Sequence, residues 1–316
     1  MINRRLLRIK VLQAYYAYTK RGDDSIKLTE KELLHSIEKS FDLFYYLLLL
    51  VVDIVEYART RVELAKQKNI PTYEDLHPNT SFIDNWYVKE LQEHTTFMKI
   101  INNKKISWVN YSELIRKLYH SIINSEDYND YLGRSESSVK EDKNLLITLF
   151  TNHILVSEDL YQNLEEQSIY WNDDVEYVIS MILKTIRKSS PGNLALFSGE
   201  KIFKNEEDKE FVLRLLHKVI LKQKDYKELI KIYAENWDIE RIALMDILIM
   251  ELAIAEMVEF SQIPVRVSLN EYIEISKTYS SNKSGVFING ILDKITDRLK
   301  KEKVIVKRGK GLVGER

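Results

Sequence analysis

The densest apolar patterning in the chain lies between residues 236 and 300 and predicts three consecutive helices. The first begins at the polar residues 236–238 and is apolar nearly all round as far as Met257. A helix without a polar stripe has to be buried by other helices on several sides. Asp246, Glu251 and Glu256 fall on different faces of this helix, so each is costly unless it finds a partner or an edge.

Clear start and stop signals follow this first helix. Ile263-Pro264 ends it, and Ser268 to Glu271 has the spacing of a capping box, which predicts the start of the second helix there. After a polar turn at 280–285, the third helix has one apolar face, made by Phe287, Ile288, Ile291, Leu292, Ile295 and Leu299. This segment is therefore predicted to form the buried centre of the protein.

The rest of the chain also has helical periodicity. A helix is expected from about Asn3 to Lys20, and a capping box at Thr29 to Glu32 predicts a long helix that reaches about Lys68. Further helices are expected at Phe82–Ile101, Tyr111–Ile123, Lys140–Gln167 and Val175–Lys188, and another starts after Asn205 with an acidic first turn. Nine glycines and four prolines are too few for a many-stranded fold, so the predicted class is all-α.

Positive charge gathers at the two ends of the chain. Residues 1–22 hold six basic and no acidic side chains, and residues 294–316 hold nine basic and three acidic ones, whereas the whole chain has a net charge of −1. This asymmetry indicates a localised site for a polyanion. Arg4, Arg5 and Arg8 share one helix face, and arginine suits phosphate because its guanidinium donates as a fork. The alternative for the lysine-rich carboxyl end is a merely solvated segment.

The sequence lacks the residues and motifs that several classes of enzyme and metal site require. There is no cysteine, the six histidines are not at metal-ligand spacing, and no glycine-rich phosphate loop or nucleophile elbow occurs. We therefore expect no enzyme, metal or cofactor. The longest apolar run, 43–52, is too short for a membrane span, which needs about 20 residues. Arg4, Arg5, Arg8 and Lys10 interrupt the first segment in a way not typical of a signal peptide, and the absence of cysteine fits the cytoplasm.

One set of positions runs without a gap over about sixty residues of the carboxyl-terminal half: Trp237, Arg241, Asp246, 249–253, Glu256-Met257, Ile263-Pro264, Val267, Asn270-Glu271, 275–277 and 284–294. A second, shorter set lies at the amino end, at 4–8 and 11–16. The first set resembles the NusB transcription antitermination family, and the second resembles that family's arginine-rich first helix. The chain departs from the family pattern at Ile247 and Glu251, where arginines are usual, at Tyr279-Ser280, which replaces Phe-Gly, and in about 180 additional residues between the matching pieces.

The resemblance implies a NusB-like core of two packed three-helix bundles plus a helical insert. Accordingly, we expect the first core helix in 1–24, the insert in 25–204, the rest of the core in 205–300 and a flexible basic tail in 301–316. Members of the family pair with the ribosomal protein NusE, bind the single-stranded boxA element of nascent ribosomal RNA, and join the elongating RNA polymerase complex to suppress termination. The competing hypothesis is a helical scaffold that binds only proteins.

The resemblance also assigns residues. Arg4, Arg5 and Arg8 match the family's arginine-rich RNA contact, and Phe287 matches an aromatic residue that meets RNA, although its spacing also allows a core position. The NusE face would include Tyr16 and Asp246. Tyr16 could equally be an ordinary core tyrosine, and Asp246 could cap or pair within the fold.

Overall fold

The computed structural model describes residues 4–22, 25–134, 138–196, 203, 205–234, 242–281 and 283–313. Their regular structure is helical, with no β-strand in these ranges, which confirms the all-α prediction. The chain divides into two compact units, which we call the core unit (Asn3–Ile37 and Phe203–Arg316) and the insert unit (Glu38–Ile202). No helix within the described ranges is both long and apolar enough to cross a membrane.

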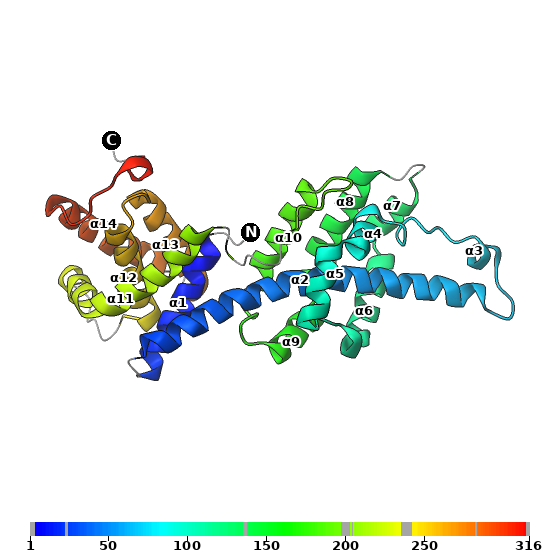
Figure 1. Cartoon of the computed structure of the whole chain (residues 1–316), viewed down its shortest axis with the longest axis horizontal. Helices are drawn as coiled ribbons and strands as arrows, with labels where there is room; N and C mark the ends of the chain where they lie inside the picture. The colour runs from blue at the N-terminus through cyan, green and yellow to red at the C-terminus, as the bar shows by residue number, and fades with distance from the viewer. Residues whose placement is uncertain are drawn as a thin grey trace. The chain divides into compact units, whose positions relative to one another are not determined.

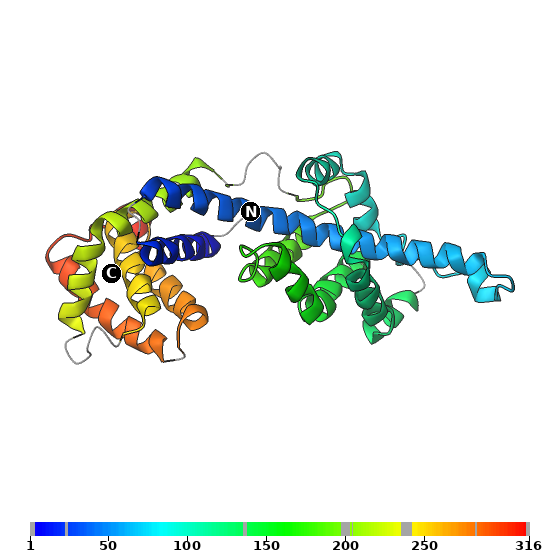
Figure 2. The same cartoon turned by 90° about the horizontal axis from the view of Figure 1, so that it is seen from below.

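The core unit is built around one buried helix, α12. It combines α1 (Arg4–Arg21), the first part of α2 (Ile26–Lys66), α11 (Glu206–Tyr233), α12 (Leu244–Glu259), α13 (Val265–Tyr279) and α14 (Ser284–Lys301). Every residue of α12 from Asp246 to Met257 is buried. Helices α12, α13 and α14 contact one another pairwise, and α1 and α11 also pack on α12 (Figures 1 and 2). The predicted apolar centre is therefore confirmed where it is described; Trp237 and Arg241 lie outside the described residues.

Both predicted capping boxes are wrong, because the helices begin earlier than the boxes indicate. Helix α13 starts directly after Pro264, whose φ of −58° suits a helix start, so Ser268 lies inside the helix. Helix α2 begins after Ser25, whose hydroxyl accepts from the Leu28 amide at 3.4 Å. The predicted acidic start of α11 is confirmed, since the Asn205 side chain caps the helix by accepting from the Asp208 amide at 3.0 Å.

The segment after α14 packs on the core unit along residues 304–313, whereas the charge pattern predicted a flexible tail. Ile305 is buried, and the Lys307 ammonium donates to the carbonyl oxygens of Met257 at 2.8 Å and Phe260 at 2.9 Å. These carbonyls belong to the end of α12, where a cation is favoured by the helix dipole. Lysine at 307 thus stabilises the end of the central helix.

The insert unit packs shorter helices around the rest of α2. Its elements are α3 (Tyr73–Leu76), α4 (Trp86–Glu93), α5 (Thr95–Lys104), α6 (Ser112–Ile123), α7 (Glu126–Leu132), α8 (Val139–Thr148), α9 (Glu158–Gln167) and α10 (Val175–Lys188) (Figure 1). Trp108 is completely buried, stacks on Tyr46 with ring centroids 3.8 Å apart, and donates its indole N–H to the Tyr46 carbonyl at 2.8 Å. Trp171 also stacks with Tyr46, with ring centroids 5.4 Å apart. These three aromatic residues therefore belong to the core of the insert unit, whereas Tyr73 is exposed.

Two helices expected in the insert unit are interrupted. The segment 82–101 divides into α4 and α5 at His94, whose ring nitrogen caps α5 by accepting from the Phe97 amide at 3.2 Å. The segment 140–167 continues from α8 into a π-helical turn at Leu149–Ile154 before α9 begins. The helix α10 has the predicted bounds.

Candidate nucleic-acid and partner interface

Arg8 forms a buried ion pair with the central helix. Its Nε and one terminal nitrogen donate to the two carboxylate oxygens of Glu256, both at 2.7 Å, and only 3% of the Arg8 side chain is exposed. Glu256 also accepts from the hydroxyls of Ser268 at 2.7 Å and Tyr272 at 3.1 Å. Burial alone would lower the pKa of Arg8, but the Glu256 carboxylate outweighs it, so the pKa is raised and the guanidinium stays charged.

The resemblance assigned Arg8 an RNA contact, but its side chain is buried and its guanidinium is directed at carboxylates of the core unit. Two nitrogens of the Arg8 guanidinium and both oxygens of the Glu256 carboxylate bond to each other, and the carboxylate has no exposed surface. A buried fork of this kind fixes the position of one helix against another. Arg8 is therefore a structural link between α1 and α12.

Arg4 and Arg5 differ from Arg8 because they lie at the surface. Arg5 donates through two nitrogens to the two oxygens of Glu271 on α13, both at 2.9 Å, and its side chain is 37% exposed. Arg4 contacts Asp208 on α11 at 3.1 Å and is 42% exposed. The hydrogen bond from Arg5 is the main reason why the pKa of Glu271 is lowered. The three neighbouring arginines thus connect α1 to three different helices.

Phe287 lies in the first turn of α14. Its side chain is half-buried, so it is neither a fully buried core residue nor a fully exposed one. The same turn packs on α13, since a Cβ at Gly285 would lie 3.6 Å from the Ser276 hydroxyl and 3.9 Å from Ile273. The Arg5 partner Glu271 is on the same helix, less than two turns away. Helix α13 therefore links the arginine-bearing start of α1 to the aromatic-bearing start of α14.

The two residues assigned to a partner face have different surroundings. Tyr16 is 38% exposed, and the Lys20 ammonium lies 5.7 Å from the centre of its ring. Asp246 is only 5% exposed and accepts from the hydroxyls of Ser280 and Ser284, the latter at 2.9 Å. Tyr16 is thus accessible to a partner, whereas Asp246 ties the start of α12 to the turn before α14.

The three acidic residues that interrupt the apolar pattern of α12 all have hydrogen-bond partners. This agrees with the expectation that a buried carboxylate without a partner would destabilise the fold. Besides Asp246 and Glu256, Glu251 accepts from the Tyr15 hydroxyl at 2.6 Å. The sequence could identify these carboxylates as needing partners, but it could not name Arg8, which is 248 positions away from Glu256. The sequence marked Asp208 only as part of an acidic helix start and Glu271 only as part of a capping box, so it identified neither as the partner of Arg4 or Arg5.

Glu251 is expected to make the core unit less stable as the pH rises. Burial raises its pKa to about 7, the Tyr15 hydrogen bond and Lys227 lower it only in part, and its second oxygen has no hydrogen-bond partner. Since the ordinary value is 4.5, the folded state binds more protons than the unfolded state between these two pH values, and the free energy of unfolding falls across that window. Glu251→Gln should be more stable than wild type at pH 8, by roughly 1–3 kcal/mol.

Urea unfolding of wild type and Glu251→Gln at pH 5 and pH 8 measures this effect. The difference between the two proteins should be much smaller at pH 5, where wild-type Glu251 is protonated. Glu228→Gln changes an exposed residue of α11 and serves as the control. A pH-independent difference between Glu251→Gln and wild type would contradict the raised pKa.

Comparison with known proteins places the core unit in a family. A model of the NusB family matches residues 176–297. Transcription antitermination protein NusB of Chloroherpeton thalassium is 40% identical over 114 residues, which cover 36% of this chain and 54% of that protein. The NusB protein of Salinibacter ruber is 36% identical over 106 residues, which cover 34% of this chain and 66% of that protein. The NusB protein of Alkaliphilus oremlandii is 38% identical over 93 residues, which cover 29% of this chain and 67% of that protein.

The chain belongs to the NusB family. The resemblance seen in the sequence is therefore confirmed, and the relatives are named as transcription antitermination proteins rather than as enzymes. The matches span between about half and two thirds of the length of these relatives. No solved structure matches the chain. The NusB-family match begins inside α10 of the insert unit and ends inside α14.

Proposed function

We propose that this protein is an RNA-binding transcription antitermination factor that pairs with the ribosomal protein NusE and binds boxA-like single-stranded RNA in nascent ribosomal transcripts. Through this pair it would join the elongating RNA polymerase complex and favour processive transcription in the cytoplasm. The observation that carries the proposal is the pair of surface arginines, Arg4 and Arg5, at the start of α1. One of them is held on the same helix that supports Phe287.

Single-stranded RNA requires cations for its phosphates and flat groups for its unpaired bases. Arg4 and Arg5 offer partly exposed guanidinium groups, and the carboxylates of Asp208 and Glu271 hold them in fixed positions. A fixed fork loses less conformational entropy when it binds phosphate than a free side chain does. In this proposal Phe287 supplies the flat surface, and Arg8 positions the helix without touching RNA.

The proposed NusE face includes Tyr16, which is accessible and amphipathic. Asp246 supports this face indirectly, because its hydrogen bonds to Ser280 and Ser284 fix the turn between α13 and α14. Mixing the purified protein with purified NusE in analytical ultracentrifugation tests the pairing. Tyr16→Ala should weaken the complex if the face is assigned correctly.

RNA binding should depend strongly on salt and on two arginines. Each phosphate contact on a single strand adds about −0.7 to the slope of log affinity against log salt, so the double variant Arg4→Ala, Arg5→Ala should flatten that slope by about 1.4. Fluorescence anisotropy with a boxA-like RNA and a scrambled RNA, with and without NusE, measures this slope. Arg116→Ala is a matched control, since Arg116 is an exposed, ion-paired arginine of the insert unit.

The second candidate is a helical scaffold that binds only proteins. It is favoured by one observation, namely that Arg4, Arg5 and Arg8 each already have a carboxylate partner. Equal affinity for the two RNAs, or an unchanged salt slope in the double variant, would support the scaffold and contradict RNA recognition. A complex with NusE that forms without any RNA binding would give the same answer.

A further inference from the structure

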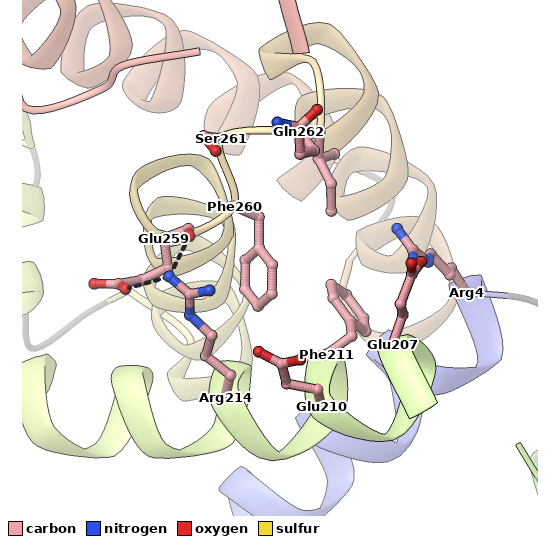
Figure 3. A pocket seen from close by; sticks show the side chains of 10 residues that line it. Arg4, Glu207, Glu210, Phe211, Arg214, Glu259, Phe260, Ser261 and Gln262 are labelled. Atoms are coloured by element: carbon pink, nitrogen blue, oxygen red, sulfur yellow. Dashed lines mark hydrogen bonds and ion pairs between the residues drawn. The ribbon is translucent and has the colours of Figure 1, made fainter. Parts of the chain in front are cut away.

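A small pocket opens in the core unit beside Arg4, one of the two surface arginines of the proposed RNA contact. It lies between the first turns of α11, the end of α12 and the following segment 261–263, and has a volume of about 260 Å³ (Figure 3). Sites for drug-sized ligands usually occupy about 300–1,000 Å³, so this pocket suits one small planar group. The side chains that matter to its chemistry are Arg4, Glu210, Phe211, Arg214, Phe260 and Gln262.

Two aromatic rings and two guanidinium groups line the pocket. The rings of Phe211 and Phe260 lie 4.9 Å apart at an angle of 57°. The Arg4 guanidinium lies 5.3 Å from the centre of the Phe211 ring, and that of Arg214 lies 5.2 Å from the centre of the Phe260 ring. Arg214 is further fixed because it donates to the Glu259 carbonyl at 2.8 Å. Aromatic rings and guanidinium planes of this kind are the surfaces on which unpaired bases stack.

Glu210 adds a hydrogen-bond acceptor to this flat environment. It lies on α11 between Phe211 and Arg214 in the view of Figure 3, and no ion pair or hydrogen bond joins it to another described residue. A carboxylate accepts two parallel N–H bonds, one on each oxygen. Guanine is the RNA base whose pairing edge presents two adjacent N–H donors, at its ring nitrogen and its amino group. Adenine, cytosine and uracil present only one donor group on that edge.

We propose that this pocket receives one unpaired guanine of the bound RNA, which stacks on Phe260 and donates to Glu210. The inference rests on the proposed function, because the RNA strand would reach the pocket past Arg4. A phosphate is disfavoured here because Glu207, Glu210 and Glu259 line the pocket. A basic side chain is disfavoured because the guanidinium groups of Arg4 and Arg214 already line the pocket and would repel another cation.

The test uses the full chain and short oligouridylates that differ at one central position. Fluorescence anisotropy compares central guanosine with uridine, adenosine and inosine, which lacks the amino group of guanosine. Guanosine should bind about tenfold more tightly than the other three, the size expected when one bidentate base contact is lost. Glu210→Gln should remove this preference while the binding of unsubstituted oligouridylate is kept. Phe260→Leu should also reduce the preference, through lost stacking.

Glu228→Gln changes an exposed carboxylate farther along α11 and should keep the preference for guanosine. Circular dichroism of each variant confirms that it is folded. Oligouridylate binding that depends on Arg4 and Arg5 but is equal for all four bases would overturn the pocket and leave the proposed function intact. Absence of binding to every RNA would overturn both. Binding of a short arginine-rich peptide that Glu210→Gln abolishes, without any preference for guanosine, would assign the pocket to a basic side chain instead.

Discussion

Replacing Arg8 by alanine is expected to lower the free energy of unfolding of the core unit by about 3–5 kcal/mol. The substitution leaves the Glu256 carboxylate completely buried and without its cation, and removes two charge-assisted hydrogen bonds. The hydroxyls of Ser268 and Tyr272 still donate to Glu256, but they carry no charge. Arg8→Lys should also destabilise, because an ammonium cannot donate as a fork to both carboxylate oxygens.

Urea unfolding followed by circular dichroism measures this loss. Arg5→Ala is the matched control, since Arg5 makes the same forked pair at the surface with Glu271, where a salt bridge contributes only about 0–1 kcal/mol. The two substitutions remove the same side chain from the same helix, and they differ in burial. Equal losses for Arg5→Ala and Arg8→Ala would contradict the structural role that burial gives to Arg8.

The second large effect is expected in the insert unit, where Trp108→Ala should cost about 3–5 kcal/mol of unfolding free energy. Trp108 is completely buried and stacks on Tyr46, so alanine leaves a large cavity. Trp108→Phe should cost less, because it keeps most of the packing and leaves only the Tyr46 carbonyl without its indole donor.

Urea unfolding of the two Trp108 variants separates packing from hydrogen bonding. Trp86→Ala is a control in the same unit, because the Trp86 side chain is only partly buried and its indole donates to Glu90, a surface residue. A loss for Trp108→Ala no greater than that for Trp86→Ala would show that Trp108 is not part of the insert core.

The helical class and the buried centre could be predicted because they depend on local patterns. An apolar run without a polar stripe, as in α12, has no stable place except inside a helical core. Helix starts were harder to place. Ser268 and Glu271 have the spacing of a cap, but the two side chains are used for contacts to Glu256 and Arg5 on other helices. Tertiary contacts thus overrode a local signal.

For the candidate RNA contact, the sequence could predict which arginines gather at the start of α1, but not which partner each one contacts. The sequence placed Arg4, Arg5 and Arg8 on one face of a helix, and they do start α1 together. Whether each faces water or a carboxylate depends on residues more than 200 positions away, such as Asp208 and Glu256, and no local pattern encodes that pairing. The break at His94 coincides with a side-chain cap on α5, which the apolar spacing of the segment does not show.

The contact between Lys307 and the end of α12 gives the carboxyl-terminal segment a role in shaping the neighbouring pocket. Phe260, whose carbonyl accepts from Lys307, also contributes a wall of that pocket, and the Arg308 amide donates to the Ser261 carbonyl at 3.0 Å. A Cβ at Gly311 would lie 2.0 Å from the Ser261 carbonyl oxygen. Any larger residue at 311 would therefore push the backbone of the carboxyl-terminal segment away from Ser261. A Gly311→Ala protein would therefore be a means of perturbing the proposed guanine pocket from outside the cavity, without altering any side chain that lines it.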